Sequence, residues 1–190
     1  MLKTEIKLLI LSLGLVAVIL IFGKYWDSFS EEDLESFISK KGIQVPAEDL
    51  KADYRQWPGL TDLKAEPGLV LVSFWASWCS PCIRELKDFV KLDTIFDGSV
   101  LIVALGVGET EASMNEFRET HELTGPGIYF ISDSEKEISD QFQVANLPYT
   151  LIADAEGNVM YSVLGIRDWL SNDFKDFIDF LAMHPKKQYL

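Results

Sequence analysis

Two cysteines at the junction of a predicted strand and a predicted helix constrain this chain more than any other feature. They stand in the sequence Cys79-Ser80-Pro81-Cys82 and are the only cysteines present. Residues 70–74 form a short apolar run of the kind found in buried strands. Residues 83–96 place apolar side chains at mostly three- and four-residue intervals, and proline is tolerated in the first turn of a helix. The pattern predicts a strand at about 69–75 and a helix at about 80–96.

This junction predicts different roles for the two thiols. Cys79 falls at the helix N-terminus, where unpaired backbone N–H groups and the helix dipole favour the thiolate over the thiol. The thiolate is the form that attacks a disulfide, and Cys82 is near enough to close the ring afterwards. We therefore predict a redox dithiol in which Cys79 attacks and Cys82 resolves, and which needs no further cofactor.

Other readings of the two cysteines are weaker. A purely structural disulfide has no need of a strand-to-helix junction. A zinc site needs about four ligands, but His121 and His184 have no second Cys or His close in sequence. We expect no metal site.

Length, composition and charge limit the possible functions. At 190 residues and 48% hydrophobic, the chain is suited to one domain with an ordinary core plus an appendage. Its net charge of −13 argues against binding to nucleic acid and against adsorption to an anionic membrane surface.

The appendage is an apolar segment near the N-terminus. Residues 8–23 carry no charge, and although 16 residues fall short of the usual span of about 20, Lys7 and Lys24 can snorkel at its ends. Tyr25-Trp26 supplies an interfacial belt, and the basic residues before the segment place the N-terminus in the cytoplasm. Residues 1–26 are therefore predicted to be a single-pass anchor in a bacterial inner membrane, with the rest of the chain outside the cytoplasm.

Two alternatives to an uncleaved anchor remain. The first is a cleaved signal peptide, for which the nearest small-x-small site is residues 28–30, several residues past the apolar run. The second is a buried helix of a soluble domain, which the lack of a polar face disfavours.

Three further regions follow the anchor. Residues 27–66 are expected to be a lead-in, with a helix that starts near 30–33, ends at Gly42 and gives way to an irregular connector lying against the domain. Residues 67–184 are the predicted domain, and residues 185–190 are a tail.

The predicted domain alternates strands with helices. Strands are expected at 69–75, 100–107, 127–131, 149–153 and 159–164, and helices at 80–96, 112–123, 135–142 and 169–183. Such alternation predicts parallel βαβ units, and the turn after residue 153 predicts an antiparallel hairpin. The expected class is α/β, with a mixed central sheet and helices on both faces.

Three motifs give the chain a family resemblance. They are VSFWASWCSPC at 72–82 followed by Glu85, VALGVGE at 103–109, and NLPYTLI at 146–152. Together they resemble the thioredoxin fold, and more narrowly the TlpA/ResA-like family of membrane-anchored, extracytoplasmic thiol-disulfide oxidoreductases, over residues 69–181. The helix and strand expected between residues 111 and 131 match the central insertion of that family.

The resemblance implies a cis-proline opposite the cysteines. The family holds the position of Pro148 in cis, which exposes the backbone of Leu147 for strand-like pairing with a substrate and keeps metals away from the thiols. The alternative is an ordinary trans-proline at the edge of a strand.

The resemblance also implies roles for two glutamates. Glu85 matches a carboxylate that influences thiol protonation, and the alternative is a solvated glutamate on a helix. Glu109 matches a glutamate beside the site, expected here among the substrate-binding residues, and the alternative is a carboxylate that caps the helix before Ala112.

The remaining expected contacts surround the cysteines. Trp75 and Trp78 match the family and are expected to line an apolar docking surface. Further substrate contacts are expected from Ser80, Pro81, Leu147 and Tyr149. Two residues depart from the pattern: Tyr149 stands where Thr is commoner, and Ser73 replaces the buried Asp of compact thioredoxins. Trp26, Trp57 and Trp169 are assigned to membrane contact or packing.

The predicted function is reduction of disulfides in proteins outside the cytoplasm. Electrons would pass from a membrane thiol donor through this domain to an oxidised partner, and the resemblance suggests apocytochrome c, hence cytochrome c maturation. An oxidase or isomerase shares the same chemistry and differs in reduction potential.

Three other functional classes fit the sequence less well than a reductase does. A Cu(I)-binding module could use the two cysteines but lacks a nearby Met or His ligand. A thiol peroxidase would need Thr or Ser three residues before Cys79, where Ala76 stands. A pure scaffold would have no use for the cysteine pair.

Overall fold

The computed structural model describes residues 31–46, 50–61 and 67–183. The expected membrane anchor over residues 8–23 and the expected tail lie outside these ranges. Within them, no helix combines the length and the hydropathy that a membrane crossing requires.

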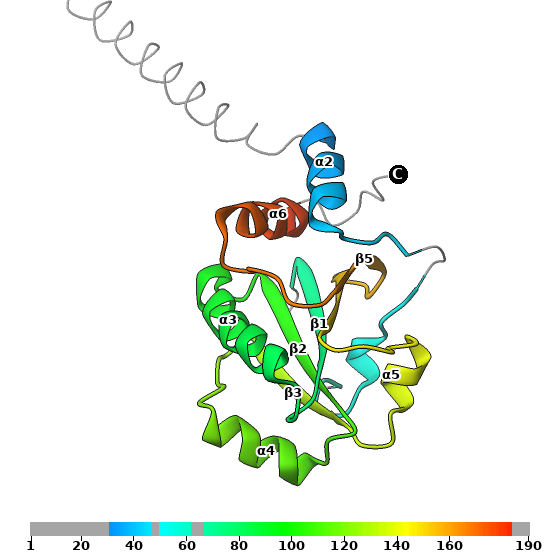
Figure 1. Ribbon diagram of the computed structural model, residues 1–190, viewed down its shortest axis with the longest axis vertical. Helices are drawn as coiled ribbons and strands as arrows, with labels where there is room; N and C mark the ends of the chain where they lie inside the picture. Colours follow the sequence, from blue (N-terminus) through cyan, green and yellow to red (C-terminus); the bar gives the residue numbers. More distant parts are fainter. Residues whose placement is uncertain (1–30, 47–49, 62–66, 184–190) are drawn as a thin grey trace, which may run out of the picture.

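The described part of the chain is organised around one mixed sheet of five strands (Figure 1). The strands are β1 (Leu69–Trp75), β2 (Val100–Val107), β3 (Ile128–Asp133), β4 (Tyr149–Asp154) and β5 (Val159–Leu164). Their order is β3-β2-β1-β4-β5, with β1, β2 and β3 parallel and β4 antiparallel to both of its neighbours. The predicted parallel units and the predicted hairpin are both confirmed.

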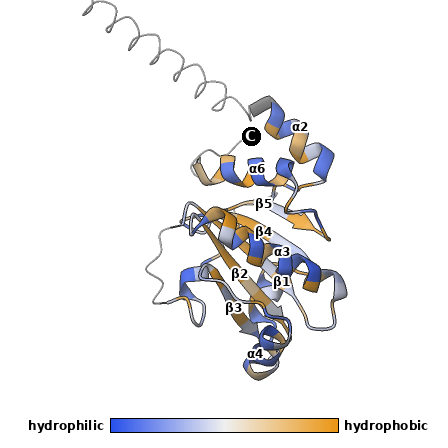
Figure 2. Ribbon diagram, turned by 90° about the vertical axis from the view of Figure 1, so that its left-hand side faces the viewer, coloured by the Kyte–Doolittle hydropathy of each residue, from blue (hydrophilic) through white to orange (hydrophobic). Residues whose placement is uncertain are grey.

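Helices pack against both faces of this sheet. They are α2 (Glu31–Lys41), the 3-10 turn η1 (Tyr54–Gln56), α3 (Ser80–Phe96), α4 (Glu111–Thr120), α5 (Glu137–Gln141) and α6 (Asn172–Met183). Side chains of α2, α3, α4 and α6 join the core on one face, and η1 lies in the core on the other, where α5 also packs. Figure 2 shows the strands largely in hydrophobic colours, while α2 and α6 mix hydrophobic and hydrophilic residues.

Alternation along the central strand explains the two cores. Leu71 and Trp75 of β1 enter the α3 side, whereas Val72 and Phe74 enter the η1 side, and all four are fully buried. Successive side chains of a strand point to opposite faces, so a strand covered on both faces reads as a continuous apolar run. This is why residues 69–75 were recognisable as a buried strand.

The lead-in is part of the packed domain. Phe37 of α2 contacts the rings of Phe174 and Phe177 on α6. Further along, Gln44 exchanges backbone hydrogen bonds with Ser162 of the edge strand β5. Residues 31–46 and 50–61 therefore supply side chains to both cores.

Several helix boundaries differ from the expected ones by one to three residues, and the starts of α4 and α6 bear on the site. The helix expected at 112–123 begins at Glu111 because Thr110 is its N-cap, accepting a hydrogen bond from the Ser113 N–H at 3.2 Å. The helix expected at 169–183 begins at Asn172, so Trp169 lies in the loop between β5 and α6.

Candidate active site

The two cysteines form a buried disulfide at the start of α3. Cys79 follows β1 and is the N-cap residue of the helix, and Cys82 lies in the first turn, with a Cα–Cα separation of 5.3 Å. The two residues are 4% and 1% exposed. The N–H groups of Cys82 and Ile83 are directed to the carbonyl of Cys79. Cys79 is therefore the cysteine at the positive end of the helix dipole.

Glu109 fixes the loop that leads into the cysteines. The backbone N–H of Ser77 donates to its Oε1 at 2.7 Å, and the Ser113 hydroxyl donates to its Oε2 at 2.8 Å. Burial alone would raise the pKa of Glu109, but these hydrogen bonds outweigh it and lower the pKa, so the side chain is an anion at neutral pH.

This geometry rules out one of the two roles expected for Glu109, because the N-cap of α4 is Thr110. The two carboxylate oxygens accept hydrogen bonds from Ser77 and Ser113 and so hold the loop that leads into Cys79. A contact of Glu109 with a substrate stays a prediction.

The two tryptophans that flank the cysteines lie in different environments. Trp78 is 75% exposed, as a docking surface requires. Trp75 is fully buried and stacks on Phe117 of α4 at a centroid distance of 4.8 Å. The expectation that Trp75 lines a docking surface is wrong, because the pleat of β1 turns its side chain into the core.

The Leu147–Pro148 peptide bond is cis, as predicted. The next residue, Tyr149, pairs with Phe74, so Pro148 lies beside the end of β1 that leads to Cys79. Gly165 donates its N–H to the Pro148 carbonyl at 2.8 Å from the side of β5. Pro148 is buried, whereas Leu147 and Tyr149 are partly exposed on either side of it.

Glu85 is a buried carboxyl one turn beyond Cys82 on α3. It is 1% exposed, so the alternative of a solvated helix glutamate is wrong. Its Oε1 accepts hydrogen bonds from the indole Nε1 of Trp169 and, at 3.5 Å, from the hydroxyl of Thr150 on β4. Its Oε2 is buried and has no partner.

Burial raises the pKa of Glu85 from 4.5 to about 7. The hydrogen bonds from Trp169 and Thr150 and the charge of Arg167 oppose this rise, and Asp88 adds to it. Glu85 can therefore gain and lose a proton near neutral pH.

The contact of Trp169 with Glu85 has no signature in the sequence. The two residues are 84 positions apart along the chain, and the sequence predicts only packing or membrane contact for Trp169. No local motif marks such a contact, because it depends on how the loop before α6 folds back over α3.

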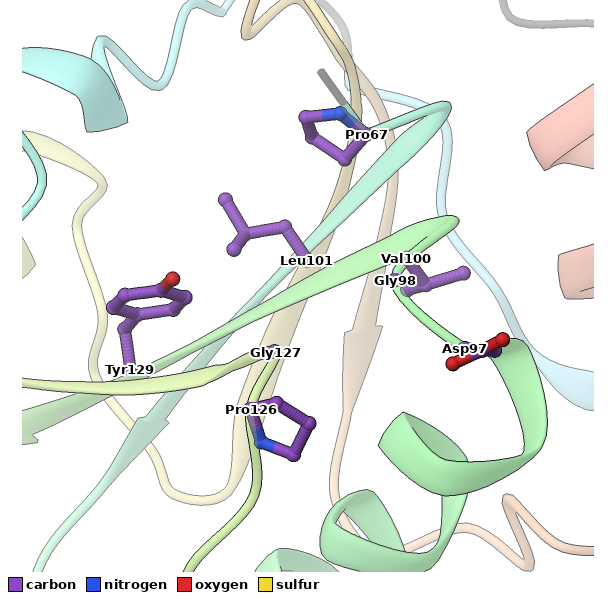
Figure 3. A pocket seen from close by; sticks show the side chains of 8 residues that line it. All are labelled: Pro67, Asp97, Gly98, Val100, Leu101, Pro126, Gly127 and Tyr129. Carbon is purple, nitrogen blue, oxygen red and sulfur yellow. The ribbon is translucent and has the colours of Figure 1, made fainter. Parts of the chain in front are cut away.

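A separate pocket lies away from the cysteines. It is lined by Pro67, Asp97, Gly98, Val100, Leu101, Pro126, Gly127 and Tyr129 (Figure 3). Asp97 is the C-cap of α3, whereas Cys79 is its N-cap, so the pocket is at the other end of a helix about 25 Å long. In the described ranges, no group of three or more His, Cys, Asp and Glu side chains is placed to hold a metal.

Comparison with known proteins now identifies the family. The model of the AhpC/TSA family matches residues 30–162, which include both cysteines and the cis-proline. The chain belongs to the AhpC/TSA family. The match begins just before α2, so it includes the lead-in that packs into the domain.

Curated relatives agree with the resemblance found in the sequence. The chain is 28% identical over 147 residues to the thioredoxin-like protein YneN of Bacillus subtilis, covering 76% of this chain and 83% of that one. It is 29% identical over 121 residues to the thiol-disulfide oxidoreductase ResA of the same organism, covering 63% of this chain and 65% of ResA. It is 28% identical over 168 residues to the thiol:disulfide interchange protein DsbE of Pseudomonas aeruginosa, covering 87% of each.

Solved structures show the same fold. A putative thioredoxin from Neisseria meningitidis superimposes with a TM-score of 0.56 at 17% identity, covering 75% of this chain and 91% of that one. With the fold, the family and the Cys79–Cys82 pair in place, this member of the AhpC/TSA family is a thioredoxin-like thiol-disulfide oxidoreductase.

Proposed function

We propose that the protein reduces disulfides of partner proteins outside the cytoplasm, using Cys79 and Cys82. The observation that carries this proposal is Glu85, a buried carboxyl with a pKa of about 7 one turn beyond the resolving thiol. A group that titrates near neutral pH can take the proton of Cys82 when that thiol is needed as a thiolate.

The reaction begins with the reduced dithiol. The Cys79 thiolate attacks one sulfur of the partner disulfide, forms a mixed disulfide and expels the other partner sulfur as a thiolate, which takes a proton from water. Cys82 then passes its proton to Glu85 and attacks the Cys79 sulfur. This step closes the Cys79–Cys82 disulfide and releases the second partner thiolate. Two electrons move to the partner, and the oxidised form is the one seen in the structure.

Partner binding falls to the residues around the disulfide. The exposed Trp78 offers an apolar contact beside Cys79, and Ser80 and Pro81 are accessible at the start of α3. The backbone of Leu147, next to the cis-proline, is assigned to strand-like pairing with an extended partner segment. Tyr149 is partly exposed beside it.

The names of the relatives support the partner class. ResA and DsbE are called a thiol-disulfide oxidoreductase and a thiol:disulfide interchange protein. We assign oxidised extracytoplasmic proteins, with apocytochrome c as the leading candidate, as the substrates, and a membrane thiol donor as the source of electrons.

The reduction potential of the Cys79–Cys82 couple tests the direction of electron flow. Full-length protein in detergent should be equilibrated with glutathione buffers of known potential, and the dithiol fraction measured by thiol trapping. We expect a value closer to thioredoxin, about −270 mV, than to the oxidant DsbA, about −120 mV. A potential near that of DsbA would make the protein an oxidase and contradict the proposal.

The assignment to the outside of the cytoplasmic membrane has its own test. Residues 8–23 are proposed as an uncleaved anchor because they are uncharged and flanked by lysines. Carbonate-washed membranes should retain the protein, and an impermeant thiol reagent should label the reduced protein in intact spheroplasts. A shortened, soluble form that begins near residue 31 would show cleavage instead.

A further inference from the structure

We propose that Trp169 is a positioning residue for the thiol chemistry: its indole N–H holds one oxygen of Glu85, so that the other oxygen carries the exchangeable proton. This inference rests on the proposed role of Glu85. It assigns a function to a residue in the loop between β5 and α6, far along the chain from the cysteines.

Packing restricts the orientation of Trp169. The side chain is fully buried, with the ring of Phe89 on α3 at a centroid distance of 5.2 Å and that of Phe174 on α6 at 4.9 Å. Because the indole is held between these two helices, its N–H is directed at Glu85 Oε1. The hydrogen bond therefore orders the carboxyl relative to the body of α3.

The two oxygens of Glu85 are thereby made unequal. Oε1 accepts hydrogen bonds from Trp169 and Thr150, and an oxygen that already accepts two donors is a poor site for a proton. Oε2 is buried without a partner. The proton that Glu85 exchanges with Cys82 therefore resides on Oε2.

Other charged groups near Glu85 also influence its pKa. Arg167, in the same loop as Trp169, favours the ionised carboxylate, and Asp88, one turn further along α3, opposes it. The other charged residues on this part of α3, Arg84 and Lys87, are exposed, and the thiols of the reduced site precede Glu85 on the helix. None of these groups is altered when Trp169 is replaced, so a change in the titration of Glu85 reports the indole N–H.

The direction of the effect follows from the charge state that the hydrogen bond stabilises. A donor to a carboxylate favours the ionised form, so its removal raises the pKa of Glu85. Trp169→Phe keeps an aromatic ring between the helices and removes the N–H. Because a hydrogen bond to a charged group is among the stronger ones, we expect the pH midpoint of Glu85 to rise by about one pH unit or more.

Two readouts test this in full-length protein. The first is the rate of reduction of oxidised glutathione by the dithiol form between pH 5 and 9, whose inflection near neutrality should move to higher pH in W169F. The second is the infrared C=O band of protonated Glu85 in the oxidised protein, identified by its loss in E85Q, whose titration should move in the same direction.

Two controls separate positioning from packing. Trp57→Phe changes a buried tryptophan in the core on the other face of the sheet, so it should leave both midpoints in place even if it lowers stability. In the E85Q background, W169F should cause no further change in the pH profile. If W169F fails to fold, the wild-type protein is labelled with 5-fluorotryptophan, whose indole N–H is a stronger donor. The label should lower the pH midpoint of Glu85. Labelled E85Q, which lacks this carboxyl, is the control.

The outcomes distinguish this inference from the proposed function. If E85Q abolishes the inflection while W169F and the fluorinated protein leave it unmoved, Trp169 only packs and the inference is wrong. If E85Q itself leaves the inflection unchanged, the proposed role of Glu85 fails, and the role of Trp169 fails with it.

Discussion

Replacing Cys82 by serine is expected to trap the protein in a mixed disulfide with its substrate and to reduce turnover to background. Cys79 can still attack, because its place at the N-cap of α3 is unchanged. Without the second thiol, however, nothing in the site can displace the partner from the Cys79 sulfur. The trapped species should appear on non-reducing gels of membranes that express C82S and should disappear on addition of dithiothreitol.

The matched variant is Cys79→Ser, which should abolish turnover without accumulating a mixed disulfide. Cys82 lies in the first turn of the helix at 1% exposure and should not replace Cys79 as the attacking residue. If alkylation of the reduced protein at neutral pH labelled Cys82 faster than Cys79, the two roles would have to be exchanged.

Elements with strong local signals were predictable from the sequence. The bounds of β1 and α3 match the expected 69–75 and 80–96, because a two-sided buried strand and a proline in the first helical turn are both local features. The cis bond before Pro148 was predictable only through the family resemblance, since proline alone does not determine its isomer.

Local sequence patterns could not predict which site residues are buried and which are exposed. Trp75 and Trp78 are three residues apart, yet one is fully buried and the other 75% exposed. The difference arises because β1 ends at Trp75 and the chain then turns outward in a loop held by Glu109. Glu85 likewise reads as a surface glutamate of α3 until the loop with Trp169 is placed over it.

The lead-in was likewise predictable only in its local structure. Its helix and the stop at Gly42, which has a φ of 61°, were predictable. The residues that it contacts were not, because the pairing of Gln44 with Ser162 joins segments more than a hundred residues apart, and sequence patterns carry no information on such contacts.

Replacing Glu85 by glutamine is expected to change how the stability of the oxidised protein depends on pH. An acid whose pKa is raised on folding binds its proton more tightly in the folded state, so stability falls as pH rises from the unfolded value of 4.5 to about 7. At about 1.4 kcal/mol per pKa unit, this interval corresponds to about 3 kcal/mol in the free energy of unfolding. The cysteines do not contribute, because they are joined in the disulfide.

The quantity to measure is the difference in unfolding free energy between E85Q and the wild type at pH 4.5 and at pH 8, by chemical denaturation of the oxidised protein. Glutamine stays neutral, so the difference should shift in favour of E85Q by about 3 kcal/mol over this range. Glu116→Gln, on the exposed face of α4, should show no comparable shift. A pH-independent difference for E85Q would mean that folding leaves the pKa of Glu85 at its unfolded value. A carboxyl with a pKa near 4.5 would be a poor acceptor for the proton of Cys82 at neutral pH, which would contradict the proposed role.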